Sequence, residues 1–188
     1  ALLDEAFEAL DQVRANAAQN LVNARDVFEA AQRKLFEDGE NKKTEMKLLG
    51  DVAIFRNGIN FTKASKGEKV KIVGVKDFQN YFWIHQDNLD SVTIDGKLKE
   101  TDYLRKGDIL AVRSNGNQQL IGRSILAGDV TEKTTHSGFT IRIRFETEDI
   151  FPEYLCHYLK SEKARKQLIS GGAGISIKSL NQTTLSKL

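Results

Sequence analysis

Cysteine, proline and long apolar runs are scarce or absent in this chain of 188 residues. Its one cysteine, Cys156, excludes an internal disulfide framework and fits a reducing compartment, so we expect a cytoplasmic protein. Its one proline, Pro152, excludes the Asn-Pro-Pro motif that an adenine methyltransferase needs. No apolar run approaches the roughly 18 residues that cross a bilayer, and there is no sign of a signal peptide. These absences predict a soluble chain without a membrane segment.

The residue patterns of metal sites and activated nucleophiles are missing as well. The histidines, His85, His136 and His157, are scattered, and neither a cysteine pair nor a His-x-x-His spacing supports a metal site. His157 and Cys156 lie in "YLCHYL", which is typical of an apolar helix. Such a helix provides neither the exposure nor the lowered thiol pKa that a nucleophilic cysteine needs.

Two further patterns resemble catalytic motifs but do not satisfy them. The stretch "GNQQLIGRS" is similar to a phosphate-binding loop, but five residues separate its glycines where the motif has four, and arginine replaces the lysine. The tripeptide Asp95-Gly96-Lys97 has the acid-x-lysine spacing of many nucleases. Because Asp-Gly between alternating apolar residues is typical of a tight hairpin, we interpret it as a turn. We therefore expect a chain that binds rather than catalyses.

Charge is distributed unevenly along the chain. The first 40 residues hold nine acids and four bases, a net charge of −5, and since the whole chain carries +2, the rest carries +7. An acidic arm joined to a basic body indicates two different partners, with a polyanion the natural one for the body. A solvated surface with ordinary scatter of charge is the alternative explanation.

A long helix is the strongest structural prediction. Residues 3–35 contain neither glycine nor proline, and apolar side chains recur every seven residues in two rows that only Arg14 interrupts. This pattern predicts a coiled-coil helix over residues 1–38, about 50 Å long at 1.5 Å per residue. Its partner helix must come from another subunit, another copy or a missing continuation, unless the helix folds back onto the body. The predicted interface residues are Leu3, Phe7, Leu10, Ala17, Leu21, Ala24, Phe28, Ala31 and Leu35.

The periodicity changes after a linker at residues 39–47, where Gly39 is expected to end the helix. Alternating apolar residues predict strands at 70–75, 92–94, 109–112, 120–126 and 138–145, the last with Phe139 among its inward residues. A segment beginning at Pro152 predicts one or two helices that end at Gly171 and Gly172. The expected fold class is α+β, with the long helix followed by an irregular, mainly β domain over residues 48–188 and helices near its end.

Several of these segments together resemble one known family. The opening "LLDEAFEALDQVRANAAQNLVNARDVFEAAQRKLF" resembles the conserved helical region of Type I restriction-modification specificity subunits. The segments "LGDVAIFRNGINF", "KGDILAVRSNGNQQLIGRS" and "SGGAGISIKSLNQTTLSKL" resemble one of their target recognition domains. The chain has one helix and one domain, about half of the family pattern. It is the second half of a long subunit, a half-length subunit or a fragment.

The resemblance implies a non-catalytic DNA-recognition role. In this family each recognition domain reads one half of a split double-stranded DNA target, and paired helices hold two domains apart. The implied partners are methyltransferase (modification) subunits, restriction/translocase subunits and a second conserved helix. S-adenosylmethionine, ATP and magnesium are implied for those partner subunits, with no cofactor in this chain. The alternative function is a non-DNA protein-interaction or oligomerisation module with a coiled-coil arm.

Candidate DNA-contacting residues lie on basic or amide-rich loops and on one strand. Lysine and arginine would contact phosphates, while arginine, asparagine and glutamine would read base edges. The alternative is an ordinary polar hairpin loop at "RSNGNQQ" and solvated lysines in "FTKASKGEK", whereas the aromatic residues of "YFWIH" are expected in the core. The candidates are Lys63, Lys66, Lys69, Arg113, Ser114, Asn115, Asn117, Gln118, Gln119, Arg123, Arg142, Arg144 and Lys178.

Overall fold

A computed structural model describes residues 1–41, 46–79, 81–147, 149–170 and 179–188. The chain divides into two compact units, residues 1–45 and residues 46–188, and each is described by itself below. We call the second unit the body. The division lies within the segment 39–47 where the sequence predicts a linker. The long helix, the β-rich body and the short helices near its end make up the expected α+β class.

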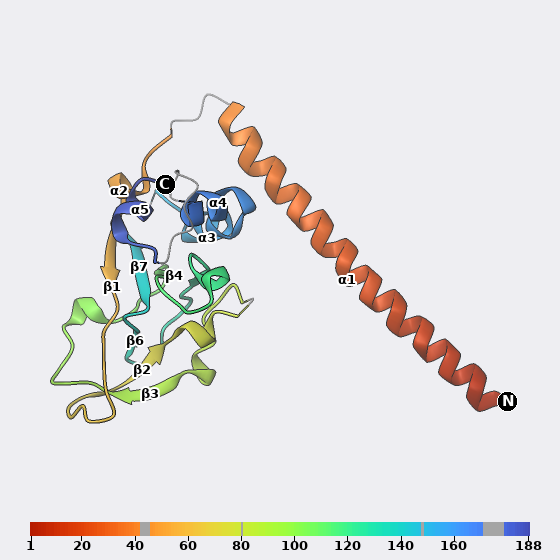
Figure 1. The fold of residues 1–188 in the computed structure, drawn as a ribbon, viewed down its shortest axis with the longest axis horizontal. Helices are drawn as coiled ribbons and strands as arrows, with labels where there is room; N and C mark the ends of the chain where they lie inside the picture. The colour runs from red at the N-terminus through yellow and green to blue at the C-terminus, as the bar shows by residue number, and fades with distance from the viewer. Residues whose placement is uncertain (42–45, 80, 148, 171–178) are drawn as a thin grey trace. The chain divides into compact units, whose positions relative to one another are not determined.

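The first unit is a single helix, α1 (Leu2–Asn41), which Figure 1 draws as one continuous ribbon. Its 40 residues correspond to about 60 Å. All nine residues of the predicted apolar rows are exposed. The helix continues past Gly39, where we expected it to end, because one glycine costs only about 1 kcal/mol in a helix. No described helix is long and apolar enough to cross a membrane.

The body is built on a four-stranded antiparallel sheet. Its strand order is β1-β7-β4-β5, so β7 and β4 are central and β4 and β5 form a hairpin. The register pairs Ile109 of β4 with Ile143 of β7 and with Leu126 of β5. The strands are β1 (Ala53–Asn57), β4 (Ile109–Val112), β5 (Ser124–Leu126) and β7 (Thr140–Phe145).

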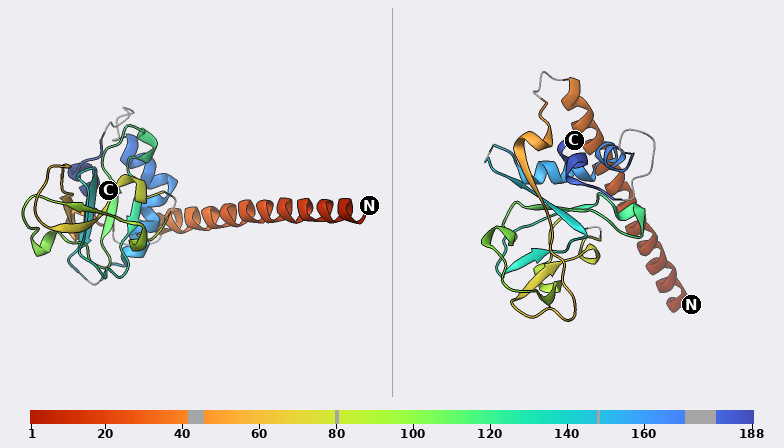
Figure 2. Two further views of the ribbon diagram at one scale, coloured as in Figure 1. Left: turned by 90° about the horizontal axis from the view of Figure 1, so that it is seen from below. Right: turned by 60° about the vertical axis from the view of Figure 1, so that its left-hand side comes forward.

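A smaller sheet with strand order β3-β2-β6 forms a second layer. Strand β2 pairs antiparallel with β3 and parallel with β6. In Figures 1 and 2, β2 and β3 lie at one end of the body and the helices gather at the other. The strands are β2 (Lys69–Val73), β3 (Asp90–Thr93) and β6 (Thr134–His136).

The central strand β4 is buried on both faces. Its side chains Ile109 and Ala111 join a core formed with the helices, whereas Leu110 and Val112 join a second core with residues of the smaller-sheet layer. A strand covered on both sides needs apolar residues at every position, which explains the unbroken run "ILAV". This run was the one strand whose predicted bounds, 109–112, match the structure at both ends.

Short helices complete the body. Pro152 is the first residue of α3, and the predicted helical segment forms two helices, as one of the two alternatives allowed. Gly171 and Gly172 lie outside the described residues. The α-helices are α2 (Leu49–Val52), α3 (Pro152–Lys160), α4 (Glu162–Ser170) and α5 (Gln182–Ser186); the 3-10 turns are η1 (Val75–Asp77), η2 (Gln86–Asn88), η3 (Glu100–Asp102) and η4 (Gln118–Leu120).

Three expectations about strands were wrong. The strand predicted at 120–126 begins only at Ser124, because the residues before it form the turn η4. Asp95-Gly96 is a turn, but β3 before it pairs with β2 rather than with a strand after it, so there is no tight hairpin. Phe139 precedes β7 and is exposed instead of facing the core with Ile141 and Ile143.

Candidate nucleic-acid interface

A surface groove of about 460 Å³ lies on the body beside its smaller sheet. Its walls come from residues 59–61, 114–116 and 137–139, with parts of β2, η1 and β3. Its apolar lining residues are accompanied by hydrogen-bonding and charged side chains, namely Asn60, Ser114, Asn115, Lys76, Asp77 and Asp90. Phe61 and Phe139 are large exposed side chains at the same groove. This combination can accept a flat, partly polar ligand edge.

We call residues 113–123 the amide loop. It connects β4 to β5, and the Gly122 N–H donates to the Val112 carbonyl oxygen at 2.9 Å, which closes the loop at its base. Gly122 has φ +75°, a conformation that L side chains rarely adopt. The "RSNGNQQ" segment therefore lies in a hairpin loop, the structure that we considered as the alternative, and this loop joins the central strand β4 to the edge strand β5.

Two amides of this loop stabilise its own backbone. The side-chain oxygen of Asn115 accepts from the Asn117 N–H at 2.8 Å, and that of Asn117 accepts from the Gln119 N–H at 3.0 Å. Each contact uses the amide oxygen and leaves the NH₂ donor for other partners. The capping function that we considered as the alternative is therefore present, and it is compatible with base contacts through the same side chains.

The amide loop divides between two surfaces. Ser114 and Asn115 line the groove, whereas Asn117, Gln118 and Gln119 are exposed outside its lining. Arg113 is half-buried and donates to the Gly138 carbonyl oxygen at 3.4 Å. Only the first part of the predicted cluster is thus brought against the groove.

Residues 58–68, which we call the lysine loop, carry Lys63 and Lys66, and Lys69 follows in β2; all three are exposed. The Asp95 carboxylate anchors this loop, accepting from the Ser65 hydroxyl at 3.0 Å and from the Lys66 N–H at 3.2 Å. The aspartate of the acid-x-lysine pattern therefore has a structural partner. The three lysines are not part of the groove lining, although residues 59–61 of their loop are.

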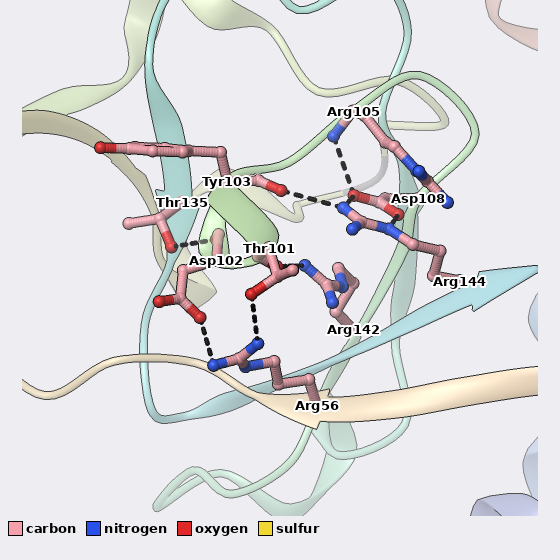
Figure 3. Close-up of polar contacts among 9 residues, drawn as sticks. All are labelled: Arg56, Thr101, Asp102, Tyr103, Arg105, Asp108, Thr135, Arg142 and Arg144. Carbon is pink, nitrogen blue, oxygen red and sulfur yellow. Dashed lines mark hydrogen bonds and ion pairs between the residues drawn. The ribbon is translucent and has the colours of Figure 1, made fainter. Parts of the chain in front are cut away.

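Arg144, which we expected to project toward DNA, is buried. Its guanidinium donates twice to the Asp108 carboxylate at 2.6 Å and once to the Tyr103 carbonyl oxygen at 2.9 Å. Asp108 also accepts from the Arg105 N–H at 2.8 Å, so this carboxylate fixes the turn that enters β4 (Figure 3). The family-like segment "KGDIL" is therefore scaffold.

Arg142 corrects the same expectation, because it is only 1% exposed. It donates to the Thr101 carbonyl oxygen at 2.8 Å, beside Arg56, which binds the Thr101 hydroxyl and the Asp102 carboxylate (Figure 3). Burial, with further contributions from neighbouring charges, lowers the pKa of Arg142 to about 10. We call Arg56, Arg142, Arg144 and their partners the arginine network. The polar face of β7 is covered by residues 101–108 and does not face solvent.

The remaining candidates have mixed outcomes. Arg123 is half-buried and donates to the Gln79 carbonyl oxygen at 3.1 Å, while Lys178 lies outside the described residues. Tyr81 and Trp83, expected in the core, are about 40% exposed, and only Phe82 between them packs against a core cluster. The expectation that the aromatic residues of "YFWIH" lie in the core was therefore wrong for Tyr81 and Trp83.

Cys156 and His157, which the sequence analysis considered for catalytic or metal-binding roles, both lie in α3. Cys156 is buried in α3, and burial raises the pKa of its thiol to about 11, which opposes a nucleophilic role. His157 lies along the same helix and stacks on Phe82 with ring centroids 4.3 Å apart. Within the described ranges, no group of three or more His, Cys, Asp or Glu side chains is arranged to hold a metal ion.

Comparison with known proteins gives results at the level of structure alone. No family model matches the sequence, and no curated protein matches it. A structure determined to explain complex assembly and conformational transition of the type I R-M system is similar, with TM-score 0.55, 10% identity, and 94% of this chain and 44% of that chain covered.

Two subunit structures are similar in the same way. The HsdS subunit from Thermoanaerobacter tengcongensis has TM-score 0.53 and 12% identity, with 92% of this chain and 42% of that one covered. The Type-I restriction-modification system S subunit from M. genitalium has TM-score 0.53 and 14% identity, with 87% and 40% covered. The chain spans less than half the length of these structures, and over that span it has the fold of Type I restriction-modification specificity subunits.

Proposed function

We propose that this chain is a DNA sequence-recognition module that reads one half of a bipartite target for a Type I restriction-modification enzyme. The observation that carries the proposal is the fold that this chain shares with the three Type I restriction-modification structures described above. The similarity covers 87–94% of this chain. The amide loop supports it independently, because asparagine and glutamine are the residue types that read adenine in the major groove.

In the proposed mechanism, phosphate contacts position the body and amides read the bases. The exposed Lys63, Lys66 and Lys69 contact the DNA backbone and carry no sequence information. The NH₂ donors of Asn115 and Asn117 face base edges, and a good bidentate contact discriminates against the wrong base by about 1–3 kcal/mol. Arg113, in the same loop, carries the guanidinium donors that bind the edge of a guanine base.

The proposal extends to the assembly. Helix α1 pairs through its apolar rows with a second conserved helix, from a missing segment or another copy, and the paired helices carry the modification and restriction subunits. S-adenosylmethionine, ATP and magnesium act on those subunits, in the cytoplasm. The described part of this chain contributes recognition and scaffold but no catalytic group.

The test is a map of methylated bases in cells with and without this gene, with the methyltransferase subunit present. We expect a discontinuous adenine-methylation motif that disappears when the gene is deleted. Random methylation by the complex would sink the proposal.

Asparagine-to-aspartate substitutions sharpen the test, because aspartate keeps the capping oxygen but replaces the NH₂ donor. Asn115→Asp and Asn117→Asp should retain the fold and abolish or change methylation at one half of the motif. The matched control is Asn88→Asp, a substitution of an exposed residue in η2 that belongs to neither loop and does not line the groove, and it should leave the motif unchanged. If all three variants methylate like the wild type, these amides do not read bases.

A second function, an oligomerisation module without DNA contact, is favoured by one observation, the exposed apolar rows of α1. Such a stripe requires a protein partner under either function. The two differ in the body: only the recognition module has salt-dependent affinity for duplex DNA.

A further inference from the structure

Three cations from distant parts of the body converge beside the amide loop. The Lys160 ammonium at the end of α3 donates to the Tyr81 carbonyl oxygen at 2.8 Å, and Arg123 donates to the carbonyl oxygen of Gln79 in the same segment. Arg165 of α4 donates to the Gln119 carbonyl oxygen at 2.9 Å. We call Arg123, Lys160 and Arg165 the cation cluster.

The cluster has no counter-charge in the part of the chain that the structure describes. Ion pairs there join carboxylates to other cations of the body, among them Arg144, Lys133 and Lys166, but to no member of the cluster. Each member makes one hydrogen bond to a carbonyl oxygen, although lysine has three donors and arginine five. Among described residues, the Nη1 atom of Arg165 is buried without a hydrogen-bond partner.

The three charges also act on one another. Burial, followed by the charges of Arg123 and Arg165, lowers the pKa of Lys160 despite an opposing contribution from Cys156. Burial and then Arg123 lower the pKa of Arg165. All three side chains are half-buried, so solvent screens their repulsion incompletely. A bound anion would relieve both the repulsion and the lost hydration.

We propose that the cation cluster binds a phosphate group of the DNA backbone, with Arg123 and Lys160 in contact and Arg165 positioning the amide loop from behind. This inference rests on the proposed function, because it names DNA as the source of the phosphate. Arg165 holds the backbone of Gln119, and Arg123 belongs to the amide loop itself. A phosphate bound here therefore fixes the register of the loop against the bases.

The test is a salt titration of duplex DNA binding by the 188-residue chain and by the double variant Arg123→Gln/Lys160→Gln. Losing one neutralised phosphate lowers the steepness of log affinity against log salt by about 0.9, and this is the decrease that we expect. At 0.15 M salt this corresponds to roughly 5-fold weaker binding, equally for every DNA sequence. The charge-retaining variant Arg123→Lys/Lys160→Arg should keep the wild-type slope.

Lys166→Gln is the matched control, since Lys166 lies on α4 beside Arg165 but pairs with Glu162 at 2.6 Å. It should bind DNA as the wild type does, and circular dichroism should show all variants folded. A double variant that is folded and keeps the wild-type slope overturns the phosphate site while leaving recognition intact. Weaker binding by the double variant together with random methylation would instead support the site and overturn the proposed function. Absence of salt-dependent binding in the wild type overturns both.

Discussion

The arginine network and the cation cluster are two basic groups in one body with opposite environments. In the network, Arg144 is matched by the Asp108 carboxylate and Arg56 by Asp102, and Arg142 and Arg144 are buried whereas Arg56 is exposed. In the cluster, Arg123 and its neighbours are half-buried, bind only carbonyl oxygens and repel one another. The difference teaches that carboxylates within the fold can neutralise arginines that the sequence alone predicts to contact nucleic acid.

The covered face of β7 also explains why Arg142 and Arg144 were wrongly expected to be exposed. In "TIRIRF" the alternation is typical of a sheet with one solvated face, so Arg142 and Arg144 were expected to be exposed. The second face is covered by residues 101–108, a segment far away in the sequence. Local periodicity identifies which residues share a face, but not whether that face meets water.

The largest effect on stability is expected from removing the negative charge of Asp108 in the arginine network. Asp108→Asn leaves the guanidinium of Arg144 buried without its counter-charge, and we expect the free energy of unfolding to fall by about 3–5 kcal/mol. Urea unfolding followed by circular dichroism measures it. Asp129→Asn is the control, because its pair with Lys106 is exposed and contributes about 0–1 kcal/mol. Equal losses for both variants would remove the distinction between buried and exposed pairs.

An intermediate effect on stability is expected in acid, and it comes from His136. The ring of this histidine contacts the Thr140 hydroxyl at 2.8 Å, beside the arginine network. Burial, and then the charges of Arg142, Arg56 and Arg144, lower the pKa of His136 from 6.5 to about 3. The unfolded chain therefore takes up a proton below pH 6.5 that the folded chain refuses, so stability is complete above pH 6.5 and falls toward pH 3. The expected loss is about 1.4 kcal/mol per pH unit.

This acid dependence is measured by urea unfolding between pH 7 and 5, before most carboxylates titrate. His136→Gln should lower the slope of stability against pH, whatever its effect on stability at pH 7. His85→Gln, which changes an exposed histidine, is the control for the removal of one histidine. An unchanged slope in His136→Gln would show that folding does not alter proton uptake by this histidine, against the expectation.

The smallest effect is expected from the cation cluster. Arg123→Gln removes one hydrogen bond to a carbonyl oxygen but also relieves repulsion, so stability should stay within about 0.5 kcal/mol of the wild type. Wild-type stability should rise with moderate sodium chloride, and the variant should gain less from it. Thermal unfolding at several salt concentrations measures both. A large destabilisation by Arg123→Gln would make this cluster structural, like the arginine network.

The sequence predicted the elements with strong local signals. The helix over the first unit, the strand at Ile109–Val112 and the helix beginning at Pro152 follow from heptad spacing, an unbroken apolar run and proline at a first helical turn. Strand β6 was missed because it is short and polar, and β1 was missed because its apolar residues do not alternate; both pair with strands far along the chain, β2 and β7. Such strands are stabilised by partners that lie far along the chain.

The sequence predicted the residue types of the candidate site better than it predicted where they lie in the fold. The hairpin loop and its amides were recognised from glycine and asparagine spacing, while the groove beside Ser114 and Asn115 depends on loops that meet only in the folded body. Lys160 and Arg165 were missed, although the charged run "KSEKARK" contains both. Nothing in that run distinguishes them from Lys166, whose pairing with Glu162 became evident only in the structure.

The amide loop starts and ends on two neighbouring antiparallel strands, and the Gly122 N–H to Val112 contact closes it. Doubling the length of such a loop costs only about 0.6 kcal/mol of chain entropy. Leu120 and Ile121 pack into the two cores, whereas residues 114–119 belong to neither core cluster. A different run of residues can therefore replace 114–119 without repacking either core. Under the proposed function, a new target could thus arise by exchange of this short segment, while the frame that carries it is inherited unchanged.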